Sequence, residues 1–149
     1  MSIKIGLVIL SLLILLLPDC VTVPKEAKVI QVIDGDTIVI EGGYHVRYIG
    51  IDTPEKGQPY YEEAKQSNQE LVDGKVVRLE KDVTDKDKFE RLLRYVYVDS
   101  LLVNGELVKQ GYAEVYPKDR YPDNKYYDLL KEVEREAREA GRGIWGSNS

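Results

Sequence analysis

Residues 28–50 read KVIQVIDGDTIVIEGGYHVRYIG, a series of β-branched segments separated by turn residues. The segments 28–33, 36–41 and 44–50 are rich in Val and Ile, which favour β-strands. Asp34-Gly35 is typical of a turn, and Gly42-Gly43 is typical of a β-hairpin. We therefore predict that the folded part of the chain opens with a three-stranded antiparallel meander.

The rest of the chain alternates between strand-like and helix-like patterns. A helix is predicted where apolar side chains recur at helical spacing and Pro59 precedes them. In order, we expect a helix over 60–72, strands over 76–83 and 92–98, a short helix over 104–110 with Asn104 as its N-cap, and an amphipathic helix over 126–140. Five short strands with a helix between the third and the fourth predict an α+β fold, mainly a five-stranded β-barrel of the OB-fold type with C-terminal helices.

Composition excludes several classes of site. The 149 residues include one Cys and one His, so an intramolecular disulfide, a cysteine zinc site and a multi-histidine metal centre are excluded. The net charge of −5 argues against a polybasic nucleic-acid binder. Any hydrolytic chemistry must therefore rest on carboxylates, arginines and a hard metal ion.

The amino terminus has the pattern of an export segment. Lys4 is followed by the uncharged apolar residues 5–17 and then by Pro18-Asp19. This run is shorter than the roughly 18–20 residues that span a bilayer as a helix, and it fits the apolar core of a secretory signal. We expect residues 1–23 to be a signal peptide or an N-terminal membrane anchor and residues 24–149 to be the folded domain. The protein would then be extracytoplasmic, either secreted or attached to the membrane through residues 5–17.

Two carboxylates are expected to meet at one end of the barrel. Asp36 begins the second predicted strand and Asp52 follows the third, and these two strands are antiparallel neighbours. Paired carboxylates repel each other unless a cation lies between them, and oxygen ligands without His or Cys select Ca²⁺ or Mg²⁺. Glu55 is placed to hold a water molecule as a general base, and Arg47 offers a planar fork for a phosphate.

These residues also form a pattern that resembles the staphylococcal nuclease family. The matching segments are Asp34-Gly-Asp-Thr37, Arg47, Asp52-Thr-Pro-Glu55, Asp87-Lys-Phe-Glu-Arg91, Tyr95-Val-Tyr97 and Gly143-Ile-Trp145. The resemblance extends over about residues 27–146. It implies a Ca²⁺-dependent endonuclease that hydrolyses DNA and RNA with a metal-assisted water. No protein partner is implied, and we expect a monomer.

The resemblance also implies a role for individual residues. The implied metal ligands are Asp36 and Asp52 through their carboxylates and Thr53 through its backbone carbonyl. The implied catalytic residues are Glu55 as general base and Arg47 and Arg91 as phosphate-binding groups that stabilise the transition state. The implied substrate contacts are Lys88 and Tyr116.

Three positions depart from the family pattern, and two other functions remain open. Tyr48 stands where an aliphatic residue is typical, Glu90 where a glycine is typical, and Arg94 where a small residue is typical. Glu90 adds a negative charge beside Arg91. The alternatives are a non-catalytic OB-fold module that binds single-stranded nucleic acid and an exported Ca²⁺-binding structural domain. The retained Glu55 and both arginines favour the enzyme.

Overall fold

The computed structural model describes residues 22–119 and 124–146. The predicted signal peptide or anchor therefore lies outside the described residues, except for its last two positions. Within these two ranges no helix has the length and apolar character needed to cross a membrane.

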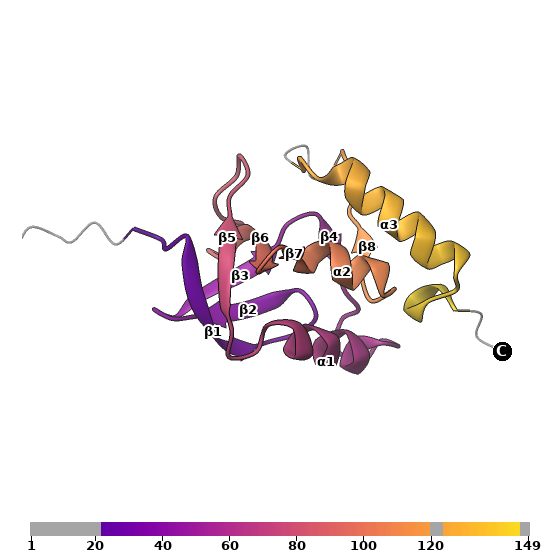
Figure 1. Ribbon diagram of the computed structural model, residues 1–149, viewed down its shortest axis with the longest axis horizontal. Coiled ribbons are helices and arrows are strands. Elements are labelled where there is room, and N and C mark those ends of the chain that lie inside the picture. The colour runs from indigo at the N-terminus through magenta and orange to yellow at the C-terminus, as the bar shows by residue number, and fades with distance from the viewer. Residues whose placement is uncertain (1–21, 120–123, 147–149) are drawn as a thin grey trace, which may run out of the picture.

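Five strands form a closed barrel (Figure 1). They are β1 (Glu26–Val32), β2 (Thr37–Ile40), β3 (Tyr44–Tyr48), β5 (Val76–Glu80) and β6 (Leu92–Val98). Antiparallel pairing runs in the order β3-β2-β1-β5-β6, and parallel pairing between β3 and β6 closes the barrel. The predicted meander and the predicted α+β OB-fold barrel are confirmed.

The third strand ends earlier than the sequence predicted. β3 stops at Tyr48, and a separate short strand, β4 (Ile51–Asp52), begins after Gly50. Gly50 has φ of +78°, a left-handed conformation that favours glycine, and a Cβ at this position would clash with the amide of Asn124. β4 leaves the barrel and pairs with β8 (Glu114–Val115) in a two-stranded sheet of its own. This break carries Asp52 away from the barrel ladder.

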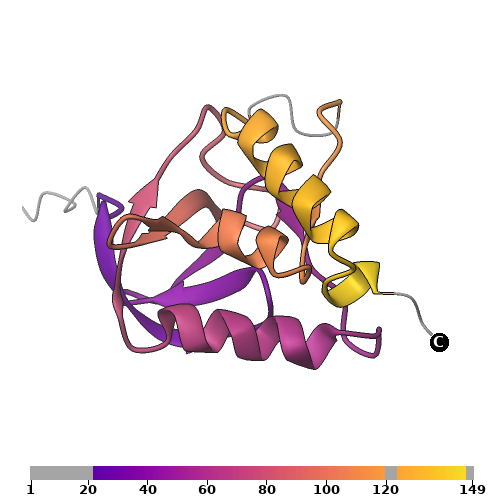
Figure 2. The same cartoon turned by 45° about the vertical axis from the view of Figure 1, so that its right-hand side comes forward.

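Helices cover one side of the barrel (Figure 2). The remaining elements are α1 (Tyr61–Val72), β7 (Leu101–Leu102), α2 (Val103–Lys109), α3 (Tyr127–Glu139) and a 3₁₀ turn, η1 (Gly143–Trp145). The three predicted helices are present with shifts of one residue at their ends. Figures 1 and 2 show α2 between the barrel and α3, and α2 contacts both.

Two local predictions were wrong. The strand predicted over 76–83 ends at Glu80, because the next residues turn away and Asp82 accepts hydrogen bonds from Tyr95 and from the backbone of Lys125. Asn104 does not cap α2, since the N-cap position is Leu102 and no side chain caps it. The fully buried Asn104 amide instead accepts from the Val96 N–H and donates to the Ile49 carbonyl.

The hydrophobic core lies inside the barrel and continues under α2 and α3. Its fully buried side chains come from every barrel strand and include Val29, Ile38, Val46, Val77 and Val96. Leu107 of α2 and Leu130 of α3 complete it. The polar groups that follow therefore stand at the margin of a well-packed apolar interior.

Candidate active site

Asp36 is held at the start of β2 by three hydrogen bonds and one ion pair. One carboxylate oxygen accepts from the backbone N–H of Thr53 at 2.9 Å and from its hydroxyl at 2.8 Å. The other oxygen accepts from the Thr37 hydroxyl and lies 3.1 Å from Nε of Arg47. The residue is only 5% exposed, so this set of donors fixes the orientation of the carboxylate.

The turn before Asp36 needs a glycine because the backbone approaches Thr53 closely. A Cβ at Gly35 would lie 2.8 Å from the side chain of Thr53. Asp34, on the other side of this glycine, accepts the backbone N–H of Asp36 at 3.0 Å. Burial, followed by the charge of Asp36, raises the pKa of Asp34. The turn thus places two acids close together in a site that favours added positive charge.

Arg47 bridges the two carboxylates that were expected to meet. Its Nε lies 3.1 Å from Asp36, one Nη lies 3.1 Å from Asp52, and the other donates to the Tyr48 carbonyl at 2.7 Å. The pairing of Thr37 with Arg47 between β2 and β3 produces this arrangement. Arg47 is 7% exposed, so the fork geometry of the guanidinium is fixed on three sides.

Asp52 is more open than Asp36. Its side chain is 44% exposed. Burial acts most strongly on this carboxyl and raises its pKa, and the charges of Asp36 and Glu55 act in the same direction. Arg47 and a hydrogen bond from Tyr116 oppose the shift without cancelling it. Asp52 is therefore a partly buried acid that is paired with Arg47 and lies near two other carboxylates.

Glu55 stands at the exposed rim of the site. It follows β4 in a short loop, where its backbone N–H donates to the side chain of Gln58 at 2.7 Å. Its carboxylate makes no ion pair with the described part of the chain, yet it lies close enough to Asp52 to affect that carboxyl electrostatically. An open cavity of about 370 Å³ adjoins Asp52, Thr53 and Gln58.

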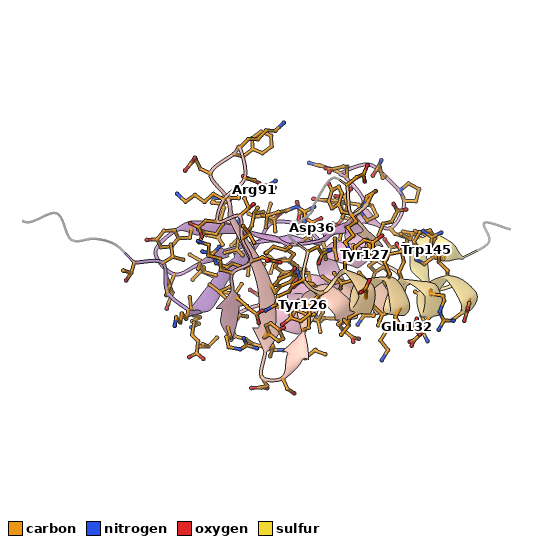
Figure 3. The ribbon with its side chains drawn as sticks, turned by 90° about the horizontal axis from the view of Figure 1, so that it is seen from above. Asp36, Arg91, Tyr126, Tyr127, Glu132 and Trp145 are labelled. Atoms are coloured by element: carbon orange, nitrogen blue, oxygen red, sulfur yellow. The ribbon has the colours of Figure 1, made fainter. Side chains whose placement is uncertain are left out.

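Arg91 comes from the loop between β5 and β6. Its Nε lies 2.7 Å from the carboxylate of Asp87, which also accepts its backbone N–H. Leu93, two residues later, pairs with Arg47 across β3 and β6. Arg91 directly precedes β6, the strand that pairs with β3 beside Arg47. Figure 3 shows Arg91 and Asp36 on one side of the barrel.

The two predicted substrate contacts lie in different surroundings. Tyr116 packs against the site, with its ring 5.9 Å from the guanidinium of Arg47 and its backbone N–H bonded to the Gly50 carbonyl. Lys88 is exposed on the β5–β6 loop, 5.0 Å from the ring of Phe89. Tyr116 is thus part of the central cluster, and Lys88 is outside it.

The donor set fits a hard cation, though not a cage made by protein alone. Within residues 22–119 and 124–146, no group of three or more His, Cys, Asp or Glu side chains is arranged to hold a metal ion. Asp36 and Asp52 supply two carboxylates, and the Thr53 backbone adjoins both. Sites of this kind complete their ligand sets with water and substrate phosphates.

Sequence reasoning missed a buried carboxylate that supports β4. Glu134 is 1% exposed on α3 and accepts the backbone N–H of Val115 at 2.9 Å. Val115 pairs with Ile51, next to Asp52. The sequence gives little indication that Glu134 is buried, because the charged segment around it is typical of a solvent-exposed helix face.

Comparison with known proteins shows which family the chain belongs to. The family model described as "Staphylococcal nuclease homologue" matches residues 45–147. The chain belongs to the staphylococcal nuclease family. It is 42% identical over 129 residues to the SPbeta prophage-derived endonuclease YokF of Bacillus subtilis, covering 79% of this chain and 43% of that protein.

Two further relatives of the nuclease family show how much of each protein the match covers. Endonuclease YncB of Bacillus subtilis is 43% identical over 129 residues, or 79% of this chain and 60% of that protein. Thermonuclease of Staphylococcus hyicus is 35% identical over 129 residues, or 80% of this chain and 75% of that protein. The chain therefore spans about half the length of the two Bacillus proteins.

The structure shows the environment of the three residues that depart from the nuclease family pattern. The Tyr48 hydroxyl donates to Asn68 inside the protein, and burial raises the pKa of that hydroxyl. Glu90 has φ of +64°, a conformation that suits glycine, and pairs with Lys86 at 3.1 Å. Arg94 is buried at 4% exposure.

Proposed function

We propose that this chain is a Ca²⁺-dependent endonuclease that hydrolyses phosphodiester bonds in DNA and RNA. The observation that carries the proposal is that Arg47 spans Asp36 and Asp52 at one end of the barrel, beside the exposed carboxylate of Glu55. Hydrolysis of a phosphodiester needs a base for water, positive charge at the phosphate and fixed positions for both. The relatives named as endonucleases and as thermonuclease support this choice.

The chain's own residues divide the chemistry between them. Glu55 accepts a proton from a water molecule that attacks phosphorus in line with the leaving oxygen. Arg47 on β3 and Arg91, directly before the neighbouring strand β6, bind the phosphate oxygens and stabilise the negative charge that develops there. The hydrogen bonds that hold Asp36 and Arg47 fix these groups before substrate binds.

The proposed metal site uses the oxygen donors described above. Asp36 and Asp52 would hold Ca²⁺ through their carboxylates and Thr53 through its backbone carbonyl, and the bound ion would supply positive charge for the phosphate. Loop-borne oxygens suit Ca²⁺ better than the smaller and more demanding Mg²⁺. Mg²⁺ is therefore expected to support less cleavage.

The proposed substrate contacts flank this centre. Tyr116 lies against Arg47 and contacts the nucleotide next to the cleaved phosphate. Lys88 reaches a neighbouring phosphate from the exposed loop. The protein acts as a monomer outside the cytoplasm, exported by residues 1–23 and either released or held at the membrane by residues 5–17.

A digestion assay tests the metal and the reaction together. Purified protein is incubated with plasmid DNA and with RNA, first with Ca²⁺ and then with an excess of chelator. We expect internal cleavage of both substrates with Ca²⁺ and loss of most activity with chelator. Full activity after exhaustive chelation would contradict the metal assignment.

Substitution of the proposed base separates an enzyme from a binding module. Glu55→Gln keeps the size of the side chain but removes the base, and turnover should fall by about 10²–10⁴-fold. Oligonucleotide affinity should change little. If the wild-type protein binds oligonucleotide but shows no cleavage above background, the non-catalytic OB-fold module is the correct reading.

A further inference from the structure

Arg94 is a buried cation that the proposed mechanism does not use. It lies on β6 with a side chain that is only 5% exposed. Its backbone carbonyl accepts the N–H of Ile49, so the residue is fixed against β3 as well. A buried arginine is retained only where its charge is compensated, and its partners show what it holds.

The partners of Arg94 belong to the β5–β6 loop. One Nη donates to the Asp85 backbone carbonyl at 3.1 Å and to the Leu93 carbonyl at 2.7 Å, and the other lies 2.8 Å from the Asp85 carboxylate. The N–H of Leu93 donates to the same Asp85 carbonyl at 2.9 Å. Asp85 is therefore fastened to the barrel through both its backbone and its side chain.

Asp85 is the base of the hairpin that carries Arg91. Lys86 forms a bridge with Leu92, and the N–H of Asp87 donates to the Arg91 carbonyl at 3.0 Å. Asp87 then binds the guanidinium of Arg91. These successive pairings link the position of Asp85 to the position of the Arg91 side chain.

Apolar packing contributes little to holding this loop. Its two large apolar side chains, Val83 and Phe89, are 76% and 67% exposed. Figure 3 shows the loop projecting from the barrel, with Arg91 on it. A loop with little apolar packing depends on its polar contacts for position. Two buried side chains of β6 hold it: Tyr95 donates to Asp82, and Arg94 contacts Asp85 at the base of the hairpin that carries Arg91.

We propose that Arg94 is a positioning residue for the reaction: it clamps Asp85 and thereby fixes the β5–β6 loop so that Arg91 meets the phosphate. This inference rests on the proposed nuclease function. Burial acts to raise the pKa of Asp85, but hydrogen bonds and charge from Arg94 and Lys81 outweigh it and leave the pKa lowered. The clamp is therefore ionised at neutral pH.

Two substitutions remove the clamp from opposite sides. Arg94→Met keeps an unbranched apolar stem in the barrel wall, and Asp85→Ala removes a carboxylate whose side chain is 43% exposed and so leaves the core intact. Misplacement of a phosphate-binding group by about 1 Å costs up to about 100-fold in rate. We expect kcat to fall by about 10–100-fold in both variants, with KM changing less.

Non-additivity distinguishes positioning from general destabilisation. If Arg94 acts through Arg91, adding Arg94→Met to Arg91→Ala should lower kcat by no more than about 3-fold further. Arg78→Met is the matched control, because Arg78 lines the same cavity of about 900 Å³ as Arg94 but makes its ion pair with Glu80, outside the hairpin. Its kcat should match that of the wild-type protein.

Amide hydrogen exchange tests whether Arg94 holds the hairpin, and this test does not depend on enzymatic activity. The amides of Asp87, Glu90 and Leu93 should exchange at least about 10-fold faster in Arg94→Met, while exchange in α3 stays as in wild type. Unchanged exchange in the hairpin, or full additivity with Arg91→Ala, would overturn the inference. A wild-type protein that does not cleave would instead overturn the proposed function, and the exchange comparison would still decide whether Arg94 holds the loop.

Discussion

Replacing Asn104 should destabilise the protein strongly, although Asn104 does not cap α2 as the sequence predicted. The β3–β6 ladder ends where the Ile49 N–H donates to the Arg94 carbonyl at 3.0 Å. In a parallel ladder the next rung joins the Ile49 carbonyl to the Val96 N–H. The amide of Asn104 stands in this rung, at 2.9 Å from the carbonyl and 3.0 Å from the nitrogen.

The expected loss follows from the two backbone groups that Asn104→Ala leaves without a partner. Each buried unsatisfied group costs about 1–3 kcal/mol. The higher helix propensity of Ala returns about 0.5 kcal/mol. The free energy of unfolding should therefore fall by about 2–5 kcal/mol. This is a large part of the roughly 5–15 kcal/mol that is typical of a whole domain.

Urea unfolding followed by the fluorescence of the single tryptophan, Trp145, measures this loss. The exposed Lys109 on the same helix provides the control, since Lys109→Ala should leave the midpoint nearly unchanged. A loss below about 1 kcal/mol in Asn104→Ala would show that Ile49 and Val96 can pair directly. The amide of Asn104 would then not replace a rung of the ladder.

Three further outcomes are expected. Glu90→Gly should raise oligonucleotide affinity by removing a charge near Arg91 and by relieving the positive φ of residue 90. Glu90→Gln should also raise the affinity, but without relieving the backbone strain. Equal affinities of both variants and the wild-type protein, measured by fluorescence anisotropy, would contradict this. Burial acts to raise the pKa of Glu80, but Lys125, Tyr126 and Arg78 lower it overall. The ionised Glu80 therefore stabilises the protein fully above about pH 4.5, and this stabilisation is lost as the pH falls further. The urea midpoint of Glu80→Gln should decline less steeply below this pH than that of the wild-type protein. Residues 1–26 fused to a reporter should carry it out of the cytoplasm or to the membrane, and a soluble cytoplasmic reporter would refute the proposed export.

Much of the candidate site could be predicted because its geometry follows from local strand order. Asp36 precedes β2 and Asp52 follows β3 by a few residues, so antiparallel pairing of β2 with β3 brings the two acids to the same end of the barrel. The link through Arg47 follows from the pairing of Arg47 with Thr37, the residue next to Asp36. The chemical roles of these residues stay predictions.

The supporting contacts could not be predicted, because they join residues distant in sequence. Asn68 on α1 binds both the Tyr48 hydroxyl and the Asp34 carbonyl, and nothing in its local pattern separates it from an ordinary helix residue. Asn104 was misread for the same reason, since an Asn at the start of a helix is most often a cap. Only the packing of α2 against the barrel turns its amide inward.

The sequence by itself determined the local elements: β-branched runs made the strands, Asp-Gly and Gly-Gly made the turns, and apolar spacing made the helices. The tertiary structure alone decided where β3 ends and how Asp52 is supported. Gly50 permits the break because of its positive φ, but Asn124 packs against it and the buried Glu134 holds the strand that pairs with β4. Backbone preference is set within a few neighbouring residues, whereas the burial of a carboxylate depends on which distant backbone group is there to donate to it.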